Sequence, residues 1–135
     1  MTENKTVQIV EIGPRDGFQN VKEFIPTEYK LHVIDGLAAA GMKKIQCTSF
    51  VSPTAIPQMR DAGEVAMRAM ERHPEVAFFA LVPNYRGAQA AAQAGLREIT
   101  PVISLSESHN QSNVRRTHEE SLAEIARIRQ DFPDL

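Results

Sequence analysis

The sequence predicts an α/β protein built on a parallel sheet, and two observations support this fold class. Short apolar segments rich in β-branched residues alternate with longer segments that carry apolar residues at helical spacing. Four such strand–helix pairs follow one another, with no linker or low-complexity tract between them. Because parallel neighbours need long crossover connections, this order predicts (β/α)n units with right-handed crossovers. The pattern alone fits both a doubly wound sheet and part of an eightfold barrel.

The first strand is predicted at residues 7–12, where a Gly-Pro pair ends it because proline cannot donate to a sheet ladder. A loop over residues 15–20 follows. A helix then opens at a Pro-Thr-Glu sequence and stops before Gly41, which suits the position just past a helix end. The second strand is predicted at residues 44–48.

The later part of the chain repeats this pattern. Its predicted elements are helix 61–72, strand 76–82, helix 85–94, strand 98–104, a polar loop 106–116 that holds His109, and a last helix 117–132. Thr117 has capping-box spacing from Glu120 and is predicted to cap that last helix. Pro101 argues mildly against its strand, since proline is rare inside central strands. We expect the helix methionines Met67 and Met70 to lie in the core.

Composition is that of an ordinary soluble protein, and we treat residues 1–135 as a single domain. The chain is 42% hydrophobic and 24% charged with a formal charge of −2, which gives no reason to expect nucleic acid or a membrane as partner. The one cysteine, Cys47, excludes an intrachain disulfide, fits a reducing compartment and is expected to be a small buried hydrophobe. No secretory signal or membrane span is recognisable, so we expect a cytoplasmic location.

Polar side chains follow each predicted strand. They are Arg15 and Asp16, the segment 46–49, Asn84, and the segment 106–110. The carboxyl ends of parallel strands meet at one face, so these groups predict an active-site face. There Asp16 can ligate a hard cation and Arg15 can stabilise a developing oxyanion. The alternatives are a surface Arg-Asp pair in a turn, or a salt bridge from Arg15 to Glu11.

Several motifs in the right order resemble one family. They are Glu11-Ile12-Gly13-Pro14-Arg15-Asp16-Gly17-Phe18-Gln19-Asn20, Thr48-Ser49-Phe50-Val51-Ser52-Pro53, Pro57-Gln58-Met59, Pro83-Asn84, Ser106-Glu107-Ser108-His109-Asn110 with Asn113, and Glu119-Glu120-Ser121. Over residues 7–122 the sequence resembles the 3-hydroxy-3-methylglutaryl-CoA lyases, metal-dependent (β/α)₈ (TIM) barrel enzymes.

The resemblance implies a reaction and a set of residues. It implies cleavage of a 3-hydroxyacyl-CoA to acetyl-CoA and a keto acid such as acetoacetate, with Mg²⁺ or Mn²⁺ as cofactor. It makes Asp16 a metal ligand and Arg15 the catalytic, substrate-binding cation beside the enolate oxygen.

Four further residues, Gln19, Gln46, Ser49 and Asn113, are expected to bind the substrate or to shape its pocket. Simple hydrogen bonding within the loops is the alternative for Ser49 and Asn113. His109 is expected to be a loop histidine held by its neighbours.

The sequence departs from the family pattern in two respects. Gln46 stands where the resemblance implies a glutamate, so it cannot act as an acid or base and the substrate or the activity can differ. The chain also carries only four βα units, whereas a complete barrel has eight over about 250 residues. We therefore expect the N-terminal half of a barrel.

A half barrel has open edges at its first and fourth strands, and such edges pair with something. We expect either association of two copies or association with a missing C-terminal half. Rival functions are a related acyl-CoA lyase or synthase and a catalytically inactive half-barrel interaction module.

Overall fold

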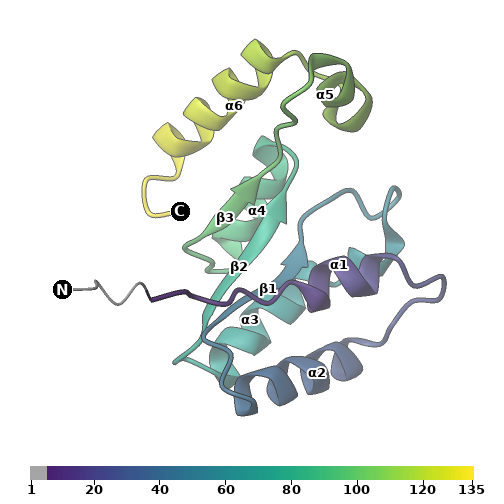
Figure 1. The fold of residues 1–135 in the computed structure, drawn as a ribbon, viewed down its shortest axis with the longest axis vertical. Coiled ribbons are helices and arrows are strands. Elements are labelled where there is room, and N and C mark those ends of the chain that lie inside the picture. The colour runs from purple at the N-terminus through teal and green to yellow at the C-terminus, as the bar shows by residue number, and fades with distance from the viewer. Residues whose placement is uncertain (1–5) are drawn as a thin grey trace.

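The computed structural model describes residues 6–135 and centres on a parallel sheet. Its strands are β1 (Lys44–Ser49), β2 (Ala77–Val82) and β3 (Ile99–Pro101), which lie side by side in chain order (Figure 1). Both strand pairs are parallel, so the carboxyl ends of all three strands point the same way. This confirms the predicted parallel α/β class.

The first predicted strand, at residues 7–12, forms only one bridge to the sheet. Glu11 N–H donates to Lys44 C=O at 3.0 Å, and Gln46 N–H donates to Glu11 C=O at 2.8 Å. The prediction of a continuous strand here is therefore wrong. Strands depend on neighbours for their stability, and Val7 is 87% exposed in the described part of the chain.

The fourth predicted strand, at residues 98–104, is shortened to the three residues of β3. Pro101 is its last residue and lies opposite Val82. The proline ring removes the N–H that a further strand could bind, so the ladder stops there.

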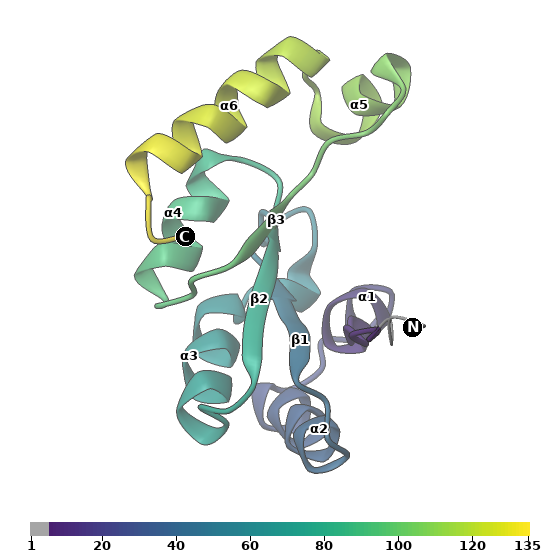
Figure 2. The ribbon, with the colours of Figure 1, turned by 60° about the vertical axis from the view of Figure 1, so that its left-hand side comes forward.

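Six α-helices and one 3₁₀ helix accompany the sheet within residues 6–135. They are α1 (Gly13–Gln19), α2 (Thr27–Ala39), η1 (Pro57–Met59), α3 (Ala62–Arg72), α4 (Tyr85–Gln93), α5 (Glu107–Val114) and α6 (His118–Asp131). Figure 2 shows α3 and α4 on one side of the sheet and α1 on the other, with α6 outside α4. None of the described helices has the length and apolar character needed to cross a bilayer.

The hydrophobic core fills the layer between the sheet and the helices on the α3 side. Its fully buried members include Leu31, Ile34, Ile45, Val65, Ala66, Ala69, Ala80, Val82, Ala88 and Ala91. Cys47 is 2% exposed and belongs to this core, as predicted, and Met70 packs against it. Met67 is 45% exposed and does not belong to the core, so its predicted core position is wrong.

A glycine ends α2 and a capping box begins α6, as the sequence predicts, and a second glycine follows α4. Gly41 (φ +92°) and Gly95 (φ +86°) adopt the left-handed conformation just past α2 and α4. After α2, Gly41 N–H donates to Ala38 C=O and the next N–H donates to Leu37 C=O, which is a Schellman motif. At α6, the Thr117 side chain accepts from Glu120 N–H while the Glu120 carboxylate accepts from Thr117 N–H.

Two segments predicted as loops are helical. Residues 15–20 lie largely in α1, where Pro14 occupies the first turn and its missing N–H costs nothing. Residues 106–116 lie largely in α5, which Ser106 caps by accepting from His109 N–H. His109 is therefore a helical residue.

Candidate active site

The candidate site lies where α1 packs against β1. Arg15 and Asp16 stand in the first turn of α1, and Gln46 lies on β1. Arg15 Nε donates to Gln46 Oε1 at 2.6 Å, and Arg15 Nη1 contacts Asp16 Oδ1 at 2.7 Å. The guanidinium group of Arg15 thus links α1 to Gln46, which lies 31 positions further along the sequence.

Burial differs strongly across this cluster. Gln46 is 3% exposed, and the Arg15 side chain is 15% exposed. The Asp16 side chain is 51% exposed and faces the open side of the cluster. The cation is therefore held inward by a buried amide, and the carboxylate remains accessible to solutes.

Of the other predicted site residues, Gln19 belongs to this cluster, whereas Ser49 and Asn113 lie outside it. Gln19 Nε2 donates to Asp16 Oδ1 at 3.4 Å, so Gln19 belongs to it. Ser49 lies fully buried at the end of β1, where its hydroxyl donates to Leu81 C=O at 3.2 Å. Asn113 is exposed on α5 and makes no hydrogen bond to the cluster among the described residues.

The alternative salt bridge from Arg15 to Glu11 does not form in the described chain. Glu11 Oε1 instead accepts from Gly13 N–H at 2.6 Å, which places the acid at the start of α1. A side chain on Gly13 would meet that same oxygen at 2.9 Å. A residue larger than glycine at position 13 would therefore displace the Glu11 carboxylate from this position.

The oxygen atoms of this cluster provide only part of a binding site for a hard cation. Asp16 Oδ1 already accepts from Arg15 and Gln19. No group of three His, Cys, Asp or Glu side chains suited to a metal occurs among residues 6–135. Mg²⁺ commonly binds one or two carboxylates and keeps several waters, so Asp16 can supply one ligand but not a complete site.

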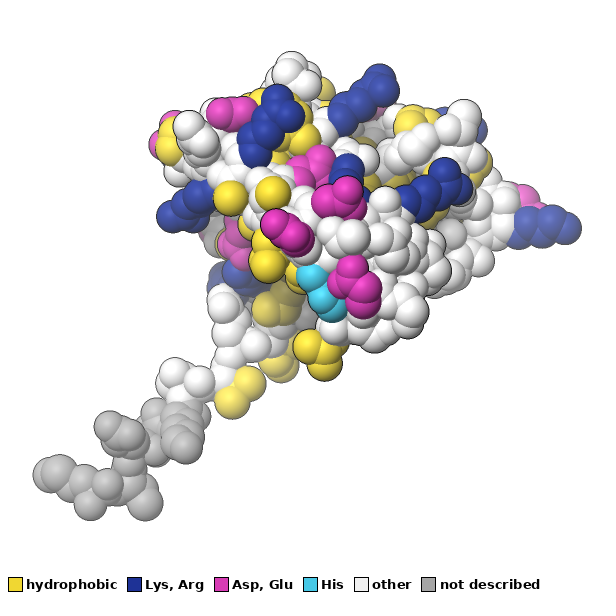
Figure 3. Space-filling view, turned by 90° about the horizontal axis from the view of Figure 1, so that it is seen from above, with side chains coloured by type: hydrophobic (Ala, Val, Ile, Leu, Met, Phe, Trp, Pro, Cys, Tyr) yellow, Lys and Arg dark blue, Asp and Glu magenta, His cyan; other side chains and the backbone are white. Residues whose placement is uncertain are grey.

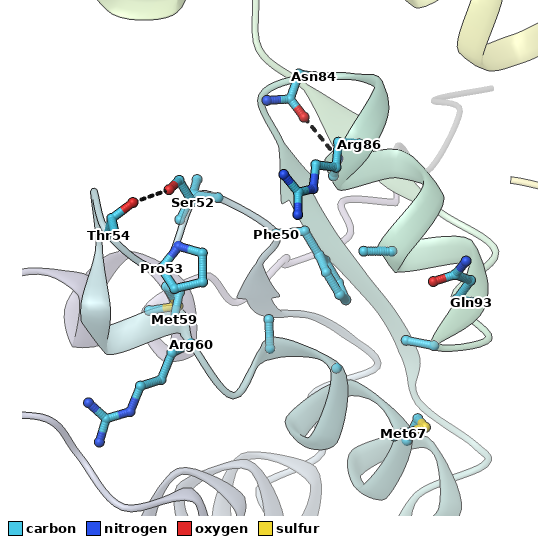
Figure 4. A pocket seen from close by; sticks show the side chains of 16 residues that line it. Phe50, Ser52, Pro53, Thr54, Met59, Arg60, Met67, Asn84, Arg86 and Gln93 are labelled. Carbon is cyan, nitrogen blue, oxygen red and sulfur yellow. Dashed lines mark hydrogen bonds between the residues drawn. The ribbon is translucent and has the colours of Figure 1, made fainter.

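A second feature near the strand ends was not predicted from the sequence. A hollow of about 800 Å³ opens between the segment that follows β1 and the helix α4 (Figure 4). Phe50 lines it, the Ser52–Thr54 hydroxyl pair lies on one side, and Arg86 reaches into it from α4. The sequence motifs at residues 48–53 and 57–59 fall on its lining, as does the Pro-Asn turn before α4, where Asn84 accepts from Gly87 N–H, but none of them predicted a hollow.

Asn110, the last residue of the polar segment 106–110, has a structural role that the sequence did not predict. It is fully buried, and its Oδ1 accepts from Ser104 N–H at 2.9 Å. Its Nδ2 donates to Arg116 C=O, Thr117 C=O and Ser121 Oγ. This amide joins the chain leaving β3 to the start of α6.

Cys47 is chemically inert in this fold. Burial raises the pKa of its thiol from 9.0 to about 12, so the group stays protonated at neutral pH. Its thiol donates to the backbone carbonyl oxygen of Phe79, at 3.5 Å. Cys47 is therefore a packing residue and not a nucleophile.

Together these features define a parallel α/β protein whose charged and amide groups gather between α1 and its first sheet strand, β1. Comparison with known proteins gives the family. The HMGL-like family model matches residues 6–131, and the chain belongs to the HMGL-like family.

The similar proteins are hydroxymethylglutaryl-CoA lyases. The mitochondrial enzyme of Bos taurus is 42% identical over 124 residues, which covers 92% of this chain and 38% of that protein. The Bacillus subtilis lyase YngG is 42% identical over 127 residues, covering 94% of this chain and 42% of that protein.

Solved structures agree with the sequence comparison. An HMG-CoA lyase from Acinetobacter baumannii, in complex with coenzyme A and 3-methylmalate, matches with a TM-score of 0.85 and 37% identity over 93% of this chain. The hydroxymethylglutaryl-CoA lyase from Pseudomonas aeruginosa matches with a TM-score of 0.86 and 36% identity over 96% of this chain. These matches cover 41% and 43% of the solved chains, so the chain spans about two fifths of its relatives. The predicted first four units of a TIM barrel are thereby confirmed.

Proposed function

We propose that the chain forms part of the active site of a metal-dependent carbon–carbon lyase. The substrate is a thioester of the 3-hydroxy-3-methylglutaryl-CoA type, which is cleaved to acetyl-CoA and a keto acid such as acetoacetate. The observation that supports the proposal is the cluster of Arg15, Asp16 and Gln46 between α1 and β1, which is held by a hydrogen bond and an ion pair. Relatives named as hydroxymethylglutaryl-CoA lyases, one of them solved with coenzyme A, support it.

Arg15 is the cation that stabilises the enolate. In a retro-aldol cleavage the substrate hydroxyl loses its proton to a base, and the broken C–C bond leaves its electron pair on the acyl fragment. Negative charge then develops on the thioester oxygen. Arg15 uses Nε on Gln46 and Nη1 on Asp16, and Nη2, which has no partner among residues 6–135, would donate to that oxygen.

Asp16 is the proposed ligand for a divalent cation such as Mg²⁺ or Mn²⁺. When bound, such a cation polarises the substrate oxygens as a Lewis acid. Asp16 presents a half-exposed carboxylate held in place by Arg15 and Gln19. Its single carboxylate requires further oxygen ligands from water, from substrate or from another chain segment.

The remaining predicted residues bind or shape the substrate. Gln19 and Gln46 orient Asp16 and Arg15 through their amides. Ser49 lines the same strand end, and Asn113 on α5 is exposed toward solvent and can reach an extended CoA arm. Gln46 cannot accept a proton, so the base is another group.

The test is binding of 3-hydroxy-3-methylglutaryl-CoA in the presence of Mg²⁺, measured by calorimetry. Removing a charged hydrogen-bond donor costs about 1.5–3 kcal/mol, so Arg15→Met should weaken binding roughly 10- to 100-fold. Arg129→Met is the matched control, because Arg129 is an exposed arginine in the last turn of α6. Equal affinities for wild type and Arg15→Met would refute the proposed role.

Two alternatives have specific support. A related acyl-CoA lyase or synthase is favoured by Gln46, and a panel of acyl-CoA substrates with Gln46→Glu separates it from the main proposal. An inactive interaction module is favoured by the single carboxylate in the described site. Failure of Mn²⁺ to raise the melting temperature, together with no cleavage of any acyl-CoA, would establish that alternative.

The cellular setting is also part of the proposal. A lone buried thiol suits a reducing compartment, and a cytoplasmic lyase of Danio rerio is 43% identical over 122 residues. We place the protein in the cytoplasm on these two grounds.

A further inference from the structure

A buried ion pair lies between α2 and the start of α3. Acidic and basic side chains are interspersed on the face of the molecule shown in Figure 3, and no patch of one charge stands out there. Between the elements, by contrast, Lys30 on α2 is 3% exposed and pairs with Asp61 at 2.6 Å. Thr27 Oγ1 donates to the other carboxylate oxygen of Asp61 at 2.8 Å. Buried polar groups that are fully paired in this way make their surroundings rigid.

This pair also holds the 3₁₀ helix η1, which consists of the Pro57-Gln58-Met59 motif. The Lys30 ammonium donates to the backbone carbonyl oxygen of Gln58 as well as to the aspartate. The next residue, Met59, is 3% exposed, and its sulfur accepts from Thr48 Oγ1 on β1 at 3.7 Å. The helix η1 is therefore attached to α2 through its backbone and to β1 through a buried side chain.

The side chain of Gln58 connects η1 to the segment that follows α1. Its Nε2 donates to Val21 C=O at 2.5 Å and to Lys22 C=O at 3.2 Å. Val21 N–H in turn donates to Phe18 C=O, in the last turn of α1, at 3.1 Å. A glutamine amide carries two N–H donors, which match these two carbonyl oxygens, whereas a carboxylate carries none. The fixed helix η1 thus reaches the end of α1 through one side chain.

The helix α1 depends on contacts at its two ends. It has seven residues, which is too short for a helix to be stable alone in water. At its start, Arg15 Nε donates to Gln46 on β1 at 2.6 Å. At its end, Asn20 Nδ2 donates back to Asp16 C=O at 2.7 Å, and Gln58 holds the residue that follows Asn20. The two glutamines therefore fix the helix that carries the candidate site from opposite ends.

We propose that Gln58 is a positioning residue for the candidate site, and that its amide fixes the end of α1 so that Arg15 stays in register with Gln46. A short helix attached at both ends keeps its angle to β1, whereas a helix attached at one end does not. Loss of the Gln58 contacts therefore displaces Asp16 and Gln19, which lie between the two attachments. The positioning follows from contacts within the described chain, and only its consequence for catalysis rests on the proposed function.

The first test is hydrogen exchange, measured by NMR, in Gln58→Met, which keeps the length of the side chain and removes both donors. Two protons report on the helix, the Val21 backbone N–H at its end and the Arg15 Nε–H at its start. Both should exchange faster by on the order of tenfold, because each lost hydrogen bond contributes a factor of about five to local stability. The Ala77 N–H, which donates to Lys43 C=O at 2.9 Å, should be unchanged.

Two further variants make this test specific. Gln89→Met is the matched control, because Gln89 is an exposed glutamine on α4 whose side chain makes no hydrogen bond within residues 6–135, and it should change neither proton. Gln58→Glu keeps the shape of the side chain but turns an acceptor toward two carbonyl oxygens, so it should accelerate exchange more than Gln58→Met does. Faster exchange at Val21 alone, equal acceleration at Ala77, or unchanged exchange in both Gln58 variants would each overturn the proposal.

Ligand binding tests the consequence for the site. Gln58→Met should weaken Mg²⁺-dependent binding of 3-hydroxy-3-methylglutaryl-CoA by about fivefold, because Arg15 and Asp16 are then no longer held against β1, and Gln89→Met should bind like the wild type. A wild type that does not bind refutes the proposed function, and the exchange of the Arg15 Nε–H then decides the role of Gln58. A wild type that binds, but no more tightly than Gln58→Met, overturns the positioning role.

Discussion

Replacement of Arg15 by methionine tests whether the guanidinium supports the fold as well as the chemistry. Gln46 is 3% exposed, and Arg15 Nε is its hydrogen-bond donor at 2.6 Å. Removing that donor leaves a buried amide oxygen unsatisfied, which costs about 1–3 kcal/mol. The lost ion pair with Asp16 adds little, because the Asp16 side chain is 51% exposed. Urea unfolding should therefore show a loss of about 1–3 kcal/mol.

A double substitution separates the two contributions of this arginine. Gln46→Met removes the stranded acceptor, so Arg15→Met/Gln46→Met should recover most of the stability lost by Arg15→Met alone. Binding of the acyl-CoA should not recover, because the cation is still missing. The reasoning fails if Arg15→Met changes the unfolding free energy by less than about 0.5 kcal/mol, or if the double variant shows the sum of the single losses.

Three further predictions concern the fold. Lys30→Met removes the ammonium group that pairs with the buried Asp61 carboxylate at 2.6 Å. The protein should lose about 3–5 kcal/mol of unfolding free energy in chemical denaturation. A loss below about 1 kcal/mol would contradict this prediction. Thr117→Ala removes the side chain that accepts from Glu120 N–H and should cost about 1 kcal/mol in the same assay, whereas no change would mean the cap is dispensable. The pKa of Cys47 is raised from 9.0 to about 12, so above pH 9 the unfolded thiol ionises while the folded one does not. Stability should therefore fall as pH rises from 9 to 12, and Cys47→Ala should remove that part of the pH dependence.

The elements that the sequence predicted well are those whose signals are local. The capping box at Thr117 and the glycines past α2 and α4 depend on residues within one turn. Strand β2 is an apolar run covered by helices, and its composition reveals it.

The elements that the sequence predicted poorly depend on distant pairing partners, or on residues that can either end a strand or begin a helix. Residues 7–12 have the composition of a strand, but pairing needs a neighbour that the described chain supplies only at Glu11. A Gly-Pro pair ends strands and also opens helices, and here Pro14 starts α1. The polar sequence of α5 carries no apolar stripe, so periodicity could not distinguish this helix from a loop.

The candidate site was predictable in its location and not in its detail. The parallel bridge between Glu11 and Ile45 brings the segment that carries Arg15 alongside β1. The 2.6 Å contact with Gln46 depends on the helical path of α1, which was not foreseen. Arg86 was missed because a single exposed arginine after a turn has no distinctive sequence pattern.

Gln46 sets the charge of the cluster, and this gives a prediction with opposite effects on two ligands. Arg15 and Asp16 cancel in formal charge, and the Gln46 amide holds the guanidinium without adding charge. Gln46→Glu makes the cluster net negative and places Arg15 between two carboxylates. Mn²⁺ affinity should rise and acyl-CoA affinity should fall, each by about tenfold, because carboxylate count tunes cation binding and the arginine is then neutralised. Calorimetry with each ligand measures both, and Gln46→Met is the neutral control. If both affinities move in the same direction, Gln46 does not act through the charge of Arg15.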